Sequence, residues 1–133
     1  PIYELSISSV SKKQLVLEIQ GKSKIQCDLK RHLSPRTVGI ILRSLPIDGH
    51  AHLMGSSIVY FETSIDSGIE RSRTEFKKGE VAFLPSTGSF CFFKSDVNTG
   101  KSMTPIGMLK GNINELTGIK SGDVLKIYEE LDW

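Results

Sequence analysis

The sequence is poor in the residues that build metal centres and disulfide frameworks. Its two cysteines, Cys27 and Cys91, lie far apart and form no C-x-x-C pair, so neither a zinc ribbon nor a disulfide framework is indicated. Free thiols favour a reducing compartment, and we expect a cytoplasmic protein. His50 and His52 could share one strand face with Asp48 nearby, but nothing supplies a further ligand at recognisable spacing. We therefore predict neither a metal nor a cofactor.

Long apolar runs and an excess of one charge are also lacking. The longest apolar run, around residues 38–42, is far shorter than a membrane span, and the N-terminus has no basic segment followed by an apolar one. With 17 basic and 15 acidic residues the net charge is +2, which is too small to imply a polyanionic partner. We therefore expect no membrane partner and no nucleic acid. Removal of an initiator methionine would leave Pro1 at the start, which predicts a nearly complete chain.

Motifs of the common enzyme classes are absent as well. The sequence contains no G-x-S-x-G nucleophile elbow and no glycine-rich phosphate loop. Cys91 stands among phenylalanines, which is the opposite of the cationic surroundings that activate a thiol. No group of residues predicts a reaction mechanism, and we assign no catalytic residue.

What the sequence does have is a period-two alternation of apolar and polar residues, which is typical of strands with one buried face. The chain of 133 residues is one domain's worth, so we expect a single domain over 1–133. Strand-like stretches occur at 2–10, 13–20, 23–29, 49–65 and 68–76. The charged residues of the last stretch are expected to protect a sheet edge rather than to bind nucleic acid, because no aromatic residues interleave them.

Two helices interrupt this pattern. Ser34 can cap a helix with Pro35 at its first position, and apolar residues then repeat at helical spacing until Pro46 ends the helix. Asn112 and Glu115 can form the capping box of a second, shorter helix. The segment after it, DVLKIYEELDW, alternates again and predicts a closing strand.

The most informative segment runs from 79 to 112. It contains GEVAFLP, then SFCFF after a turn, and then PIGMLKGNI after a polar loop. The three motifs are similar to cyclophilin segments that carry Met-Ala-Asn, Gly-Ser-Gln-Phe-Phe and Val-Phe-Gly-x-Val-x-x-Gly. The chain thus resembles a family of small uncharacterised microbial proteins with a cyclophilin-like fold. The resemblance implies a mostly β, closed cyclophilin-like β-barrel with two short helices, in which Gly107 and Gly111 allow the backbone to approach closely.

The resemblance also implies where a site would lie and what it lacks. Cyclophilins weaken the prolyl peptide bond with an arginine, and VYFETSI places Glu62 or Thr63 at that position. Neither side chain can donate the charged fork of a guanidinium. The family's histidine and tryptophan are missing too. Phe93 stands at the family's pocket phenylalanine, Leu84 near its alanine and Cys91 at its glutamine.

The sequence therefore predicts a non-catalytic binding protein. A cleft beside Phe93, Leu84, Cys91 and Met103 would take a peptide segment or a small molecule, with Glu62 and Thr63 as its polar groups. Aromatic residues in a barrel strand usually pack in the core, and Phe93 is the expected exception among the three phenylalanines of SFCFF.

Two alternatives remain open at this point. The first is a weak or altered peptidyl-prolyl cis-trans isomerase, which an arginine folded into the cleft from Arg71 or Arg73 would favour. The second is a barrel associated with urea-amidolyase-type hydrolases, which rests on fold analogy alone.

Overall fold

The fold is a mostly β structure, seen here in a computed structural model that describes residues 12–130. The strand predicted at 2–10 lies outside the described residues. In chain order the elements are β1 Lys12–Ile19, β2 Ser23–Lys30, α2 Pro35–Ser44, β3 Ile47–His50, β4 His52–Met54, β5 Ile58–Glu62, β6 Arg73–Phe76, β7 Glu80–Leu84, β8 Ser89–Phe93, β9 Val97–Lys110, η1 Ile113–Gly118 and β10 Val124–Tyr128. None of the helices in residues 12–130 is long and apolar enough to cross a membrane.

The strands form one antiparallel sheet in the order β3-β10-β1-β2-β9-β7-β8-β5-β4, with β6 paired to β9. The prediction of a closed barrel is not supported, because within residues 12–130 no ladder joins β3 to β4 at the two ends of this order. The reason is covalent. These strands are successive pieces of one segment, separated only by Ala51, so β3 pairs with β10 while β4 pairs with β5.

The predicted alternation places one face of each N-terminal strand in the core. Leu15 and Leu17 of β1 lie opposite Cys27 and Ile25 of β2, and all four are buried. The neighbouring strand β9 pairs with β2, and Gly107 lies opposite Leu29 in this ladder. A Cβ atom on Gly107 would lie 2.1 Å from the carbonyl oxygen of Asp28, so the close approach predicted at this glycine is confirmed. By contrast, Gly111 has no atom within 4 Å of such a Cβ and is required by its φ of +88° instead.

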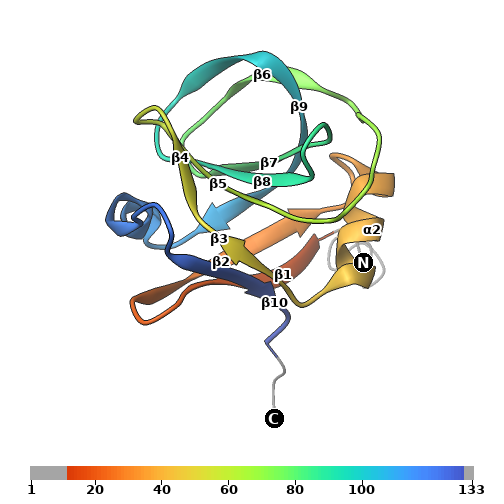
Figure 1. Ribbon diagram of the computed structural model, residues 1–133. Helices are drawn as coiled ribbons and strands as arrows, with labels where there is room; N and C mark the ends of the chain where they lie inside the picture. Colours follow the sequence, from red (N-terminus) through yellow and green to blue (C-terminus); the bar gives the residue numbers. More distant parts are fainter. Residues whose placement is uncertain (1–11, 131–133) are drawn as a thin grey trace, which may run out of the picture.

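Helix α2 covers one side of the sheet (Figure 1) and buries Val38 and Ile41 in the core. Ser34 is its N-cap residue but makes no side-chain cap bond. Its hydroxyl donates instead to the carbonyl of Pro105, at 2.7 Å. The free amides at the helix start are bonded by the distant Glu70, which accepts from Thr37 N at 2.8 Å.

The second predicted helix is a short 3-10 helix, η1, rather than an α-helix. Asn112 and Glu115 do meet, with Asn112 Nδ2 donating to Glu115 Oε1 at 3.0 Å. The predicted capping box is nevertheless wrong, because the Asn112 side chain bonds no backbone amide of the helix.

Apolar side chains gather in two clusters. The larger one, which we call the main core, lies between the two halves of the sheet and α2, and includes Phe61, Phe83, Phe90 and Phe92. The smaller one, which we call the second cluster, consists of Ile58, Phe76, Ala82, Leu84, Cys91, Phe93 and Met103. Strands β5, β7 and β8 contribute to both, because alternate residues point to opposite faces of a strand. In Figure 1, β6 and β9 arch over β7 and β8.

Candidate functional site

The apolar residues predicted for a binding cleft lie together in the second cluster. Phe93, Leu84, Cys91 and Met103 all belong to it. They do not line an open cleft, however: Phe93 and Cys91 are fully buried, Met103 is 1% exposed and Leu84 is 8% exposed. The expectation that Phe93 alone would be left out of the packing is therefore wrong. The physical reason is a second layer of chain above it.

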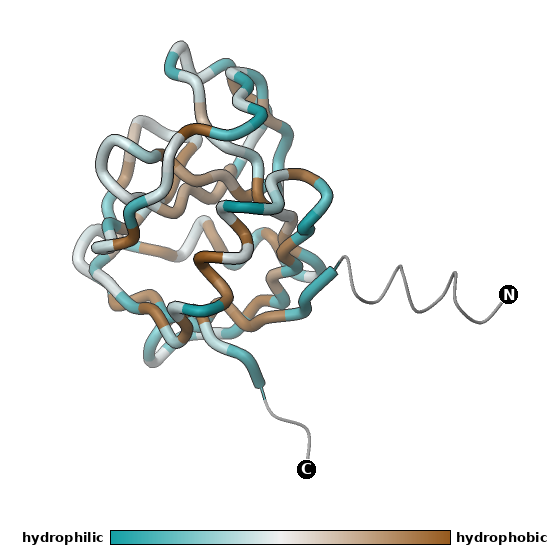
Figure 2. Tube along the Cα trace, turned by 90° about the vertical axis from the view of Figure 1, so that its right-hand side faces the viewer, coloured by the Kyte–Doolittle hydropathy of each residue, from teal (hydrophilic) through white to brown (hydrophobic). Residues whose placement is uncertain are grey.

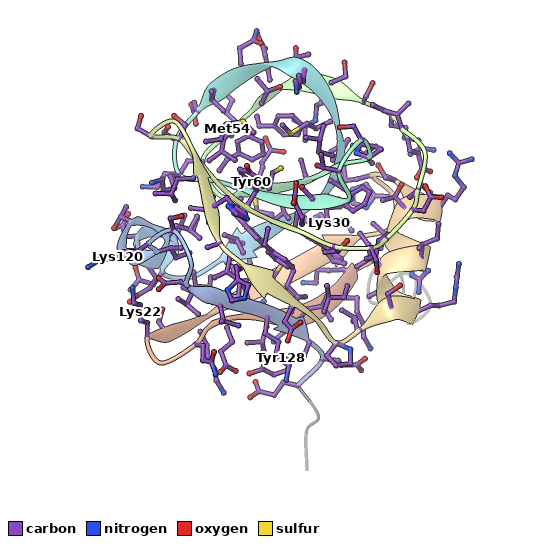
Figure 3. The ribbon with its side chains drawn as sticks, viewed as in Figure 1. Lys22, Lys30, Met54, Tyr60, Lys120 and Tyr128 are labelled. Carbon is purple, nitrogen blue, oxygen red and sulfur yellow. The ribbon has the colours of Figure 1, made fainter. Side chains whose placement is uncertain are left out.

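The floor of this cluster is the outer face of β5, β8 and β7. Residues that pair across antiparallel strands share a face, and the register aligns Ile58 with Phe93 and Tyr60 with Cys91. Figure 3 shows Tyr60 with the side chains that fill the ring formed by β6 and β9 above β7 and β8. Glu62 pairs with Ser89 on the same face but is exposed, so it lies at the rim of the floor.

Thr63 lies apart from this floor. Its hydroxyl donates to the carbonyl of Gly88 at 2.7 Å and accepts from the amide of Ile65 at 3.1 Å. Thr63 also lines a separate hollow of about 430 Å³ between the end of α2 and β3. The structure thus brings together the four apolar residues of the predicted site and separates Thr63 from them.

The layer above the floor is a two-stranded ribbon that we call the cover, made of β6 and residues 97–103 of β9. Its central contact is Phe76, whose ring stacks on that of Phe93 with centroids 4.6 Å apart and planes 7° from parallel. Val97 and Met103 add apolar contacts from β9. The outer segments at the top of Figure 2, where the cover lies, are mostly pale or teal and hence polar.

An ion pair holds the cover to the floor beside these rings. Arg73 donates through Nη2 to Glu80 Oε2 and through Nη1 to Glu80 Oε1, the latter at 3.3 Å. Glu80 also accepts from the amide of Lys77 at 2.7 Å. The Arg73 guanidinium lies 4.7 Å from the centroid of the Phe76 ring, which is within the range of a cation–π contact.

The sequence indicated that Arg73 could fold into the site, but Glu80 was not predicted as its partner. The signal was present, since Glu80 opens the fully buried strand EVAFL. A carboxylate in such a strand requires a cationic partner or several donors. Nothing in the sequence indicates which of the neighbouring cations supplies it.

A hollow of about 830 Å³ opens against the cover. It is lined by both strands of the ribbon and by the residues that flank them, namely Ser72, Arg73, Thr74, Glu75, Phe76, Lys77, Asp96, Val97, Asn98 and Ser102. Phe76 and Val97 also pack in the second cluster. The hollow is therefore separated from Phe93 by little more than one aromatic ring.

The two buried thiols are not nucleophiles near neutral pH. Burial raises the pKa of Cys91 to about 12 and that of Cys27, in the main core, likewise to about 12, so both remain protonated and unreactive. In residues 12–130, no group of three or more histidine, cysteine, aspartate or glutamate side chains could hold a metal ion. What the arrangement offers is an apolar surface beside a charged pair.

Comparisons with known proteins agree with this architecture. A family model described as "Cyclophilin-like" matches residues 13–128, whereas no curated protein gives a significant match. The solution structure of the hypothetical protein AF2241 from Archaeoglobus fulgidus is 21% identical, with a TM-score of 0.70 over 90% of this chain and 96% of that one. McbB in complex with tryptophan is 15% identical, with a TM-score of 0.74. The likeness covers 90% of this chain and only 46% of the McbB chain. At these identities the two structures bear on the fold alone.

Proposed function

Because the chain belongs to the cyclophilin-like family, we propose that it is a non-catalytic binding protein for a small molecule or a short peptide segment. The single observation that supports this proposal most is the hollow of about 830 Å³ against the cover. Binding sites are concave, with apolar walls and a few polar groups that fix the orientation of the ligand. The two free, buried cysteines fit a cytoplasmic location, which we propose as well.

The polar groups that we propose for this site differ from those expected from the sequence. Glu62 and Thr63 are not among the residues that line the hollow. Arg73, Asn98 and Ser102 are, and they stand on both strands of the cover. A guanidinium, an amide and a hydroxyl supply both donors and acceptors. These residues replace Glu62 and Thr63 in the proposal.

Titration of the isotope-labelled protein with small molecules and short peptides, followed by amide chemical shifts, tests the proposal. Tryptophan is one probe, since it is the molecule that McbB holds. We expect shifts at residues 72–77 and 96–102. Ser102→Trp should abolish them by placing an indole ring in the hollow, whereas Ser121→Trp, at an exposed turn outside the hollow, should leave them unchanged. Binding that is unaffected by Ser102→Trp would contradict the proposed site.

A weak peptidyl-prolyl isomerase remains the second candidate, because Arg73 does reach the second cluster. We rank it lower because the Glu80 carboxylate already neutralises the guanidinium of Arg73, which makes that guanidinium a weaker donor to a prolyl nitrogen. A chymotrypsin-coupled isomerisation assay on a Xaa-Pro peptide should give the uncatalysed rate. A clear acceleration that Arg73→Lys and Phe93→Ala both remove would establish the isomerase instead.

A further inference from the structure

The cover places on the floor of the second cluster two groups that are chemically unlike and adjacent. One is the ring of Phe76, which stacks on Phe93, and the other is the guanidinium of Arg73, which pairs with Glu80. The two groups also contact each other, with the guanidinium 4.7 Å from the centre of the ring. Together the two side chains present an apolar ring next to a cation, which is a combination that a small molecule could also present.

The floor beneath them is complete without the cover. Phe93 and Glu80 stand on neighbouring strands, β8 and β7. Removal of the cover would leave an aromatic face and a carboxylate side by side on a rigid sheet. Any molecule that replaces the cover has to satisfy both groups, because an unpaired carboxylate in an apolar surface is unfavourable.

The cover is held to the rest of the molecule by fewer strand pairings than the strands that enclose the main core. Among the strands of residues 12–130, β6 pairs only with β9, and its register with that strand is broken between Arg73 and Glu75. The rings and methyl groups that it contacts belong to the second cluster and not to the main core. The cover can therefore lift without exposing the main core, which is how locally less stable segments behave.

We propose that the cover is displaced by ligands that join an apolar ring to a cationic amine or guanidine, and that Phe93 and Glu80 receive these two groups. This inference rests on the proposed binding function and gives it a ligand class. A ligand enters through the hollow, whose wall includes Phe76 and Arg73. Its ring takes the place of Phe76, and its cation takes the place of Arg73.

Three matched probes test the ligand class by calorimetric titration. They are 2-phenylethylguanidine, which has the ring and the cation, 3-phenylpropionate, which has the ring and an anion, and butylguanidine, which has the cation without a ring. We expect only the first to bind the wild type. In Phe76→Ala the internal competitor is gone, so the affinity for 2-phenylethylguanidine should rise about tenfold. An equal gain for 3-phenylpropionate would overturn the assignment of Glu80 as the cation's partner.

The two cysteines test the displacement itself, because one lies beneath the cover and the other in the main core. Native protein is treated with iodoacetamide, and the labelling of Cys91 and Cys27 is followed by mass spectrometry. We expect Cys91 to react at least about tenfold faster than Cys27, faster still in Arg73→Ala, and more slowly when 2-phenylethylguanidine is bound. The Arg73 side chain is 40% exposed and Glu80 keeps its hydrogen bond from the amide of Lys77, so this variant should fold even if Phe76→Ala does not.

The outcomes separate this inference from the proposed function. Equal labelling rates for Cys91 and Cys27 would show that only global unfolding exposes Cys91, and would overturn the displacement. If ligands bind in the hollow, are blocked by Ser102→Trp and gain nothing from Phe76→Ala, the binding function stands and the inference is wrong. If no molecule binds in the hollow at all, the proposed function is wrong and the inference falls with it.

Discussion

The main core and the second cluster use opposite faces of the same strands but are enclosed in different ways. The main core is bounded by two sheet halves and a helix, and its members range from Leu15 to Ile127. The second cluster has a sheet on one side and a narrow ribbon on the other. Burial, which both clusters share, therefore does not by itself measure how firmly a region is held. Four substitutions of decreasing expected effect test that difference.

The largest effect is expected in the main core. Phe61 stacks against Phe90 and Phe92 with ring centroids 5.3 and 6.2 Å apart and is fully buried. Phe61→Ala should therefore lower the free energy of unfolding by about 4 kcal/mol, measured by urea denaturation. A loss of about 2 kcal/mol or less would show that the main core is as adaptable as the second cluster.

The same substitution in the cover should have a smaller effect. Phe76→Ala removes one stacked ring, but the cover can settle onto Phe93 or admit water, so we expect a loss of about 2 kcal/mol by the same measurement. The ratio of the two losses is the informative quantity. Equal losses would remove the contrast between the regions, because the cover would then be as firmly held as the main core.

Glu70 should have an intermediate to small effect that depends on pH. It lies in the chain between β5 and β6 and binds the start of α2. Burial alone would raise the pKa of Glu70, but the hydrogen bonds from Thr37 and Arg36 outweigh it and lower the pKa from its ordinary value of 4.5. The contribution of the carboxylate is therefore complete above the unfolded pKa and is lost as the pH falls through the lower, folded pKa.

Glu70→Gln should accordingly cost about 1 kcal/mol of unfolding free energy at neutral pH, and the gap to the wild type should close in acid. Denaturation at both pH values checks this. A gap that widens in acid would reverse the sign of the linkage. If Glu70→Gln also accelerates the labelling of Cys91 but not of Cys27, the contact steadies the cover specifically.

The smallest effect is expected on the surface, away from both clusters. Lys13 and Glu129 form an ion pair at 2.7 Å with side chains 41% and 45% exposed. Solvent and salt screen such pairs, so Lys13→Ala should change the unfolding free energy by less than about 0.5 kcal/mol. This variant is the baseline for the other three. A loss comparable to that of Phe76→Ala would mean that the measured differences do not report on the clusters.

Much of the fold could be predicted from the sequence because its signals are local. The alternation in β1 and β2, the helix that begins at Pro35 and the constraint at Gly107 each follow from residues within a few positions of one another. Whether the sheet closes into a barrel could not be predicted from such local signals, because closure depends on which strand edges meet. No local pattern indicated that one short segment, β3 and β4 with Ala51 between them, would form both edges of the sheet.

The candidate site was less predictable because its main contacts join distant residues. The motifs brought together Phe93, Leu84, Cys91 and Met103, and these four side chains do pack in one cluster. They did not indicate that Phe76 would cover it, since a single phenylalanine at the end of a charged stretch has no pattern of its own. Glu70 at the start of α2 was missed for the same reason, as it lies 33 residues beyond Thr37.

The continuity of β3 and β4 through Ala51 determines how the sheet can open. One segment holds both edges together, with four residue pairs to β10 on one side and three to β5 on the other. Ala51 is fully buried at the junction and bonds the chain around Gly122 and Asp123 at 2.8 and 2.7 Å. The two sheet edges are therefore joined covalently through Ala51. The sheet can open only if this segment loses its pairing with β10 or with β5, and we expect the shorter ladder to β5 to break first. An inserted residue at Ala51 would shift the β3–β10 and β4–β5 ladders relative to each other.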